Sequence, residues 1–156
     1  MTPTVADEVW IATALLHWEN PSRADFTLSE IVARAHREGV TPEHRDGLRP
    51  HASRHCVANA PPSPARLRML VETGRSTRRL YRPGDPVDPR RRDGRAIPRR
   101  NEIPADYHFL LDWYETQWLA RHAGAGPFEG LKGSWKDLLD GRSADDYLRE
   151  LRQEPQ

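Results

Sequence analysis

The sequence predicts a mainly α-helical protein with one small β-hairpin, followed by a long helix and an extended tail. Three observations support this prediction. Before residue 60, apolar residues recur at helical spacing in three blocks. Between residues 67 and 82 the pattern changes to two short runs that suit strands. Helical spacing returns at residue 104, after a segment rich in proline and arginine. We therefore expect four parts: 1–82, a linker over 83–103, a helix over 104–123 and a tail over 124–156.

The first two helices each begin with a capping signal. Thr4 precedes Asp7 by three residues, and Thr27 precedes Glu30 by three, which is the spacing of a capping box. The apolar residues that follow lie on one face: Val5, Val9, Ala12 and Leu16 in the first helix, and Leu28, Ile31, Val32 and Ala35 in the second. The sequence Asn20-Pro21 ends the first helix, and Gly39 ends the second.

A third helix is expected from about Leu48 to Asn59. Pro50 is compatible with its first turn, and Pro61-Pro62 prevents its continuation. Its inward face should consist of Leu48, Ala52, Cys56 and Asn59, and its outward face of Arg49, His51, Ser53 and Arg54. The outward face is small, polar and basic.

The hairpin comprises expected strands over 67–72 and 77–82, joined by the turn Thr73-Gly74-Arg75-Ser76. It carries four arginines: Arg75, Arg78, Arg79 and Arg82. The linker that follows contains the run Arg90-Arg91-Arg92, and two interpretations stay open for it: an arm that follows a polyanion, or a plain solvated connection.

The helix over 104–123 begins at Pro104 and has an apolar stripe formed by Tyr107, Leu110, Leu111, Tyr114 and Trp118. The stripe is expected either to pack on the first helix or to form the seam of a homodimer. The sequence does not separate these two arrangements.

Charge is unevenly distributed along the chain, although the net charge is only +1. Residues 1–33 hold one base and five acids, residues 34–100 hold seventeen bases and seven acids, and residues 101–156 hold six bases and eleven acids. A basic middle between acidic ends predicts a polyanionic partner for the middle. Most of the bases are arginine, which binds phosphate and guanine through two parallel hydrogen bonds.

The sequence also bears on the cellular compartment. The single cysteine, Cys56, excludes an intramolecular disulfide, and a reducing compartment is consistent with this. The N-terminus lacks the features of a signal peptide, and no apolar run is long enough to span a membrane. We therefore expect a cytoplasmic protein with no membrane partner.

Three helices followed by a hairpin, with basic residues on the third helix and on the hairpin, resemble a winged helix-turn-helix. The resemblance covers about residues 5–82 and rests on architecture and charge. It implies that the third helix enters the major groove of double-stranded DNA while the hairpin contacts the adjacent backbone. The DNA-contacting residues would be Arg49, His51, Ser53, Arg54, Arg75, Arg78, Arg79 and Arg82.

The tail resembles those of VapB-type antitoxins. The segment Gly130-Leu131-Lys132-Gly133-Ser134-Trp135-Lys136 precedes the segment Asp145-Asp146-Tyr147-Leu148-Arg149-Glu150-Leu151-Arg152, and the resemblance covers residues 128–152. It implies that the tail wraps a PIN-domain ribonuclease toxin. The implied apolar anchors are Leu131, Trp135, Leu138, Leu139, Tyr147, Leu148 and Leu151, and Lys132, Lys136 or Arg142 would enter the toxin's acidic site.

Signals for catalysis and cofactors are weak in comparison. His51 and His55 lie four residues apart beside Cys56, which is spacing that a metal could use, but a further ligand is lacking. Cys56 falls on the expected inward face, and no nucleotide-binding or hydrolase motif is present. We therefore expect no enzyme activity, no cofactor and no metal.

The predicted function is that of a DNA-binding antitoxin and transcriptional repressor whose tail neutralises a toxin. Two alternatives remain: a stand-alone winged-helix regulator with a self-packed tail, and a small metal-dependent nuclease.

Overall fold

The computed structural model describes residues 3–62 and 66–120, and all the predictions made for residues 128–152 lie outside these ranges. The described residues form two compact units. One contains residues 3–81 and 86–111, and the other contains residues 82–85 and 112–120.

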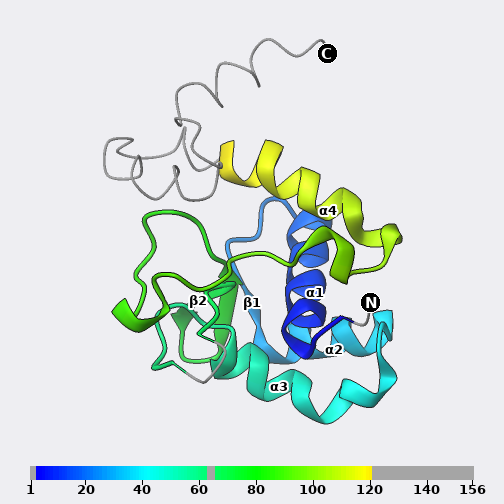
Figure 1. The fold of residues 1–156 in the computed structure, drawn as a ribbon, viewed down its shortest axis with the longest axis horizontal. Helices are drawn as coiled ribbons and strands as arrows, with labels where there is room; N and C mark the ends of the chain where they lie inside the picture. Colours follow the sequence, from blue (N-terminus) through cyan, green and yellow to red (C-terminus); the bar gives the residue numbers. More distant parts are fainter. Residues whose placement is uncertain (1–2, 63–65, 121–156) are drawn as a thin grey trace. The chain divides into compact units, whose positions relative to one another are not determined.

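The fold is mainly helical with a small antiparallel sheet, as the sequence predicts at this level (Figure 1). The sheet has three strands in the order β1-β3-β2. The elements of the first unit are α1 (Val5–Glu19), β1 (Phe26–Thr27), α2 (Leu28–Glu38), α3 (Leu48–Pro50), a π-helical turn (His51–His55), β2 (Leu70–Gly74) and β3 (Thr77–Leu80).

Helices α1 and α2 begin where the capping signals predict. The hydroxyls of Thr4 and Thr27 each accept a hydrogen bond from the backbone N–H three residues later. In turn, the Asp7 carboxylate accepts from the Thr4 N–H and the Glu30 carboxylate from the Thr27 N–H. Gly39 ends α2 with φ at +57°, a conformation that glycine adopts without a steric penalty. These boundaries are local, and short-range sequence signals were sufficient for them.

Helix α1 is buried on every side, which the predicted apolar stripe does not show. It packs against α2, α3, the π-helical turn and β3. Its buried polar groups therefore need internal partners. The Thr13 hydroxyl donates to the Val9 carbonyl at 2.8 Å, and Nε2 of His17 accepts from the Leu80 N–H at 3.3 Å. These bonds allow the Thr13 and His17 side chains to be buried within a mostly apolar helix.

The third helix is shorter than expected: it ends at His55, whereas the sequence predicts an end at about Asn59. The carbonyl of Cys56 instead accepts from the N–H groups of Met69 and Leu70, at 2.9 and 3.0 Å. The Ala58 N–H donates to the Leu70 carbonyl at 2.7 Å. The backbone after Cys56 thus pairs with the start of the hairpin. Its N–H and C=O groups are used in this pairing and are not available to continue the helix.

The hairpin is present, with strands shifted from the expected ranges to Leu70–Gly74 and Thr77–Leu80. Arg75 and Ser76 form the connection, and the register shifts between Glu72 and Gly74. The sequence did not predict β1, which pairs with β3. Two residues are too few to produce a periodic signal in the sequence, so this strand is identified only by its pairing with β3.

The segment over 83–103, expected to be a linker or an arm, belongs largely to the first unit, from Pro86 onward. It contains short helical turns at Pro89–Arg91 and Arg100–Glu102. Its backbone is bonded to the core, since the Asp88 N–H donates to the Ala58 carbonyl at 2.8 Å and the Arg68 N–H donates to the Arg95 carbonyl at 3.0 Å. The description of this segment as a linker is therefore corrected: it is an irregular but packed part of the unit.

The helix expected from Pro104 begins later. A 3-10 turn at Ala105–Tyr107 leads into α4 (His108–Trp113), which a π-helical turn (Tyr114–Trp118) follows. Of the expected stripe, Leu110, Leu111, Tyr114 and Trp118 are buried and Tyr107 is half-buried. A long helix as predicted is not seen in the described part, and its expected end falls beyond residue 120. Among the described helices, none has the length and apolar character needed to cross a bilayer.

Candidate nucleic-acid interface

Three of the predicted DNA-contacting arginines are exposed and have no partner among the described residues. These are Arg49 in α3, Arg54 in the π-helical turn and Arg75 at the hairpin connection. No hydrogen bond or ion pair holds their guanidinium groups within residues 3–62 and 66–120. The short third helix contains no acidic residue that could neutralise Arg49 or Arg54. Their charges are therefore available to an external anion.

The polar face of the third helix is arranged largely as predicted. Ala52 and Cys56 are buried, while His51 and Ser53 are half-buried beside the two exposed arginines. Asn59 is an exception, because it is exposed and not inward-facing. Its Oδ1 accepts from the Glu72 N–H at 2.9 Å and its Nδ2 donates to the Glu72 carbonyl at 3.2 Å. The side chain thereby acts as a short extension of the sheet.

Arg78 differs from the surface contact that the sequence predicts. It lies in β3 and is only 3% exposed. Its Nη2 donates to the Ser53 carbonyl at 3.1 Å, and its Nη1 donates to the carbonyls of Gly74 and Thr77 at 3.1 and 2.8 Å. Burial lowers its pKa, and the Glu72 carboxylate, 3.5 Å away, acts in the opposite direction. This buried cation fixes the third helix against the hairpin.

Arg79 and Arg82 are both half-buried. Nη1 of Arg79 donates to the Leu80 carbonyl at 3.1 Å. Arg82 belongs to the second unit, where it pairs with Asp85 at 3.9 Å and lies 5.7 Å from the ring centroid of Trp118. The structure thus joins the third helix to the hairpin through Arg78 and the Ser53 carbonyl, whereas Arg82 belongs to the second unit.

A buried arginine that the sequence does not single out supports the end of the third helix. Arg91 is fully buried, and its guanidinium donates to five backbone carbonyls at 2.5–3.0 Å. Two of these carbonyls belong to Arg54 and His55, at the helix end. A cation there also complements the negative end of the helix dipole. No local signal distinguishes Arg91 from its neighbours Arg90 and Arg92, which are both exposed.

The two histidines of the third helix interact with each other. Their ring centroids are 4.8 Å apart in an edge-to-face arrangement. Nδ1 of His51 lies 2.9 Å from the Gly47 carbonyl, which can only accept, so this nitrogen carries the proton. Desolvation lowers the pKa of His55, and the nearby His51, Arg54 and Arg91 lower it further. His55 is therefore held neutral beside a basic surface.

We expect the protein to lose stability as the pH falls through about 6.5, the ordinary pKa of histidine. Because the pKa of His55 is lowered in the folded state, the unfolded chain takes up this proton first, and acidification favours unfolding. Urea unfolding at pH 7.5 and 5.5 measures the loss. The loss should be smaller in His55→Gln and unchanged in His36→Gln, which alters an exposed histidine of α2. Equal losses in all three proteins would contradict this origin.

Cys56 has the environment of an unreactive thiol. It is fully buried, and burial raises its pKa to about 12. In the described part of the chain, no three His, Cys, Asp or Glu side chains are grouped so as to hold a metal ion.

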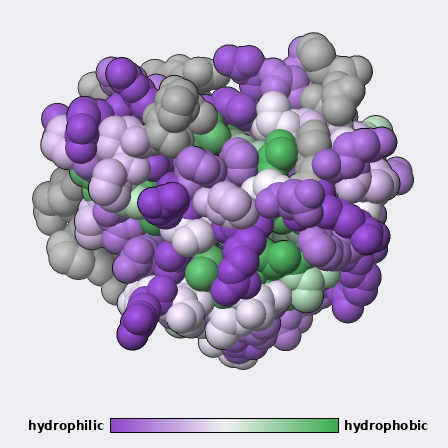
Figure 2. Space-filling model, turned by 90° about the horizontal axis from the view of Figure 1, so that it is seen from below, coloured by the Kyte–Doolittle hydropathy of each residue, from purple (hydrophilic) through white to green (hydrophobic). Residues whose placement is uncertain are grey.

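The surface around the third helix is mostly hydrophilic. Figure 2 views the molecule from the side on which α3 lies in Figure 1, and only small, separated hydrophobic areas appear among the polar residues. Such a surface suits contact with a charged and hydrated partner better than burial in an apolar interface.

In comparisons with known proteins, no family model, curated protein or solved structure matches this chain.

Proposed function

We propose that the chain is a regulator that binds double-stranded DNA through the outward face of the third helix and the β2-β3 hairpin. The order α1-β1-α2-α3-β2-β3 and the strand order β1-β3-β2 support a winged-helix arrangement. In that arrangement the third helix lies in the major groove and the hairpin contacts the flanking backbone. The observation that carries the proposal is that the guanidinium groups of Arg49, Arg54 and Arg75 on these two elements are exposed and have no partner among residues 3–62 and 66–120.

The roles of the three arginines follow from their positions. Arg49 and Arg54 lie on a short helix, so they are placed to reach guanine edges or the phosphates bordering the groove. Arg75 lies at the hairpin connection and is placed for phosphate. His51 and Ser53 supply further donors on the helix. Arg78 and Arg91 hold the two elements in position from inside the protein and make no DNA contact of their own.

Replacement of Arg49, Arg54 or Arg75 by alanine should weaken DNA binding roughly fivefold each, or about 1 kcal/mol per contact. Fluorescence anisotropy with a duplex selected from a random pool measures this at several salt concentrations. The slope of log affinity against log salt should fall by about 0.9 for each phosphate contact removed.

Arg37→Ala provides the matched control, because Arg37 is an exposed arginine of α2 outside both elements. It should bind DNA as tightly as the unaltered protein. If all four variants lost the same affinity, binding would reflect general positive charge and not this surface. If none lost affinity, the proposed interface would be wrong.

We further propose that the tail binds a protein toxin, a PIN-domain ribonuclease, so that the chain acts as an antitoxin and repressor. This part rests on the resemblance of residues 128–152 to the tails of VapB-type antitoxins. Residues 128–152 lie outside the described residues. A toxin that held two copies of the chain would bring their DNA-binding parts together and tighten operator binding through avidity.

Co-purification of the full chain with the product of the adjacent gene tests the tail. Trp135→Ala and Leu148→Ala should abolish the complex and leave the affinity for DNA intact, because both replace expected apolar anchors. Gln153→Ala, which changes no expected anchor, is the control. Absence of a complex with the unaltered chain would remove the toxin and leave a stand-alone DNA-binding regulator.

A further inference from the structure

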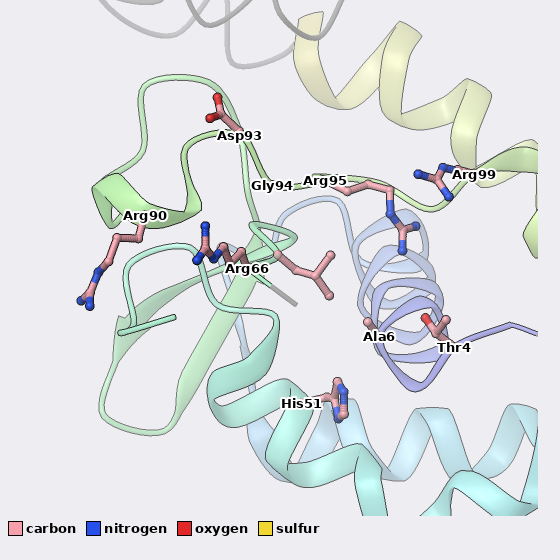
Figure 3. A pocket seen from close by; sticks show the side chains of 10 residues that line it. Thr4, Ala6, His51, Arg66, Arg90, Asp93, Gly94, Arg95 and Arg99 are labelled. Carbon is pink, nitrogen blue, oxygen red and sulfur yellow. The ribbon is translucent and has the colours of Figure 1, made fainter. Parts of the chain in front are cut away.

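A pocket of about 540 Å³ opens at the first turn of α1 (Figure 3). It lies entirely within the first unit. Its basic lining residues are Arg66, Arg90, Arg95, Arg99 and His51, and Thr4, Ala6, Leu67 and Gly94 complete most of the wall. The volume falls in the range of sites that hold small molecules and far exceeds the space that one inorganic ion needs.

The charges of the pocket are unequally neutralised. Arg90 pairs with Asp88 at 3.2 Å, Arg95 with the buried Asp7 at 3.1 Å, and Arg99 with Glu102 at 2.9 Å. Arg66 is exposed, and no hydrogen bond or ion pair holds it within the described ranges.

Asp93 is the acidic residue of the lining, and in Figure 3 its carboxylate points away from the other labelled side chains, as Arg90 does. Of the arginines that line the pocket, Arg66 is the one that no carboxylate neutralises within the described residues, while Arg95 and Arg99 contribute paired guanidinium groups.

The wall of the pocket is built by a close approach of two loops. A Cβ atom at Gly94 would lie 1.7 Å from the Arg66 carbonyl oxygen, so this position accepts only glycine without a shift of the backbone. Arg66 itself has a φ of 51°, in the left-handed region that non-glycine residues rarely occupy. Nε of Arg68 donates to the Gly94 carbonyl at 2.7 Å and holds the two loops together. A strained backbone thus places Arg66 at the rim.

Arg95 is positioned by the core. Its Nη1 atom contacts Oδ1 of Asp7, and the other carboxylate oxygen of Asp7 accepts from the Thr4 N–H. In Figure 3 the Arg95 side chain extends from its loop toward α1. Asp7 is fully buried and is occupied by the helix cap as well as by Arg95. One guanidinium edge of Arg95 is therefore anchored, and its charge is presented in a fixed place.

We propose that this pocket binds the phosphate monoester of a ligand about the size of a mononucleotide. Planar guanidinium groups are suited to the two-oxygen recognition of phosphate, and four arginines line this one concave site. A doubly charged monoester exploits such a site better than a singly charged carboxylate does. The first turn of α1, represented by Thr4 and Ala6, forms part of the wall, and the Asp7 carboxylate already caps this helix end.

This site goes beyond the proposed DNA interface and does not depend on it, because Arg49, Arg54 and Arg75 do not line the pocket. The two share only His51, which lies on the third helix and also borders the pocket.

Isothermal titration of the full chain with 5′-AMP and with adenosine tests the proposal, and ribose 5-phosphate with ribose provides a second pair. The phosphorylated member of each pair should bind, and its unphosphorylated partner should bind at least tenfold more weakly. Arg66→Ala should weaken binding roughly tenfold, as expected for loss of a charge-assisted hydrogen bond. Arg92→Ala, an exposed arginine of the same region outside the lining, should have no effect.

The phosphate can come from a free ligand or from the end of a nucleic acid strand, and a further arm separates these sources. A single-stranded oligonucleotide with a 5′-phosphate is compared with the same strand ending in a 5′-hydroxyl. Tighter binding of the phosphorylated strand, lost in Arg66→Ala but not in Arg92→Ala, would identify a strand end as the source. The proposal is overturned if phosphorylated and unphosphorylated probes bind equally, if none binds, or if Arg66→Ala changes nothing. The Arg66 side chain makes no hydrogen bond or ion pair within the described residues, so the fold of this variant should be intact, and circular dichroism checks it.

Discussion

Replacement of Arg91 by methionine should lower the free energy of unfolding by about 3–5 kcal/mol, the largest change that we expect from a single substitution outside the apolar core. Methionine fills a similar volume but donates no hydrogen bond. Five carbonyls, those of Arg54, His55, Ala60, Pro61 and Leu67, would lose their shared donor. The Arg54 carbonyl also accepts from the Val57 N–H at 3.1 Å, but a buried carbonyl that loses its donor retains the cost of desolvation, which explains the size of the effect.

Arg91→Lys separates the charge from the geometry. A lysine keeps the positive charge but has three donors on one atom, so it cannot serve five carbonyls that surround a planar group. We expect an intermediate loss of stability from it. Arg92→Met is the matched control, since Arg92 is the exposed neighbour in the chain, and it should be nearly neutral. Urea unfolding followed by circular dichroism measures all three. A neutral Arg91→Met would show that the five hydrogen bonds are not stabilising.

Replacement of Arg78 by methionine should lower the free energy of unfolding by about 2–3 kcal/mol, because this buried guanidinium joins β3 to the third helix. It would release the carbonyls of Ser53, Gly74 and Thr77. The loss should be smaller than for Arg91, since Arg78 Nε is already buried with no partner in the described part of the chain and the Glu72 carboxylate is exposed.

The comparison of Arg78→Met with Arg75→Ala separates an internal role from a surface role. Arg75 is exposed and has no partner in the described residues, so its removal should weaken DNA binding and leave stability unchanged. Arg78→Met should reduce stability, and any loss of DNA affinity should diminish at temperatures where the variant is fully folded. An Arg78 variant of normal stability with strongly weakened DNA binding would return this residue to the surface role that the sequence predicted.

Local sequence signals were reliable wherever a structural feature depends on a few neighbouring residues. The two capping boxes, the glycine at the end of α2 and the hairpin connection all follow from residues within about one turn of each other, and each is present. The charge distribution also pointed to the third helix and the hairpin as basic surfaces. Arg49, Arg54 and Arg75 are exposed there. Exposure is expected for them, because a charge without a partner is costly to bury.

The sequence could not show how arginines far apart in the chain divide between surface and interior. In the sequence, Arg90, Arg91 and Arg92 are equivalent, and so are Arg78 and Arg79. Only the tertiary fold places five carbonyls around Arg91 and the Ser53 carbonyl beside Arg78. A buried cation requires partners supplied by distant backbone, and those partners carry no sequence signature of their own.

The sequence by itself determined the helical character of this protein, its capped helices, its hairpin and its basic middle segment, since each depends on composition or on short-range spacing. The tertiary structure decided the third strand, the early end of the third helix, the packing of residues 86–103 and the arginine-lined pocket. Each of these arises from hydrogen bonds or close contacts between residues more than ten positions apart, such as Cys56 with Leu70 and Arg66 with Gly94. Contacts of that kind are set by the whole packed chain and not by any one segment.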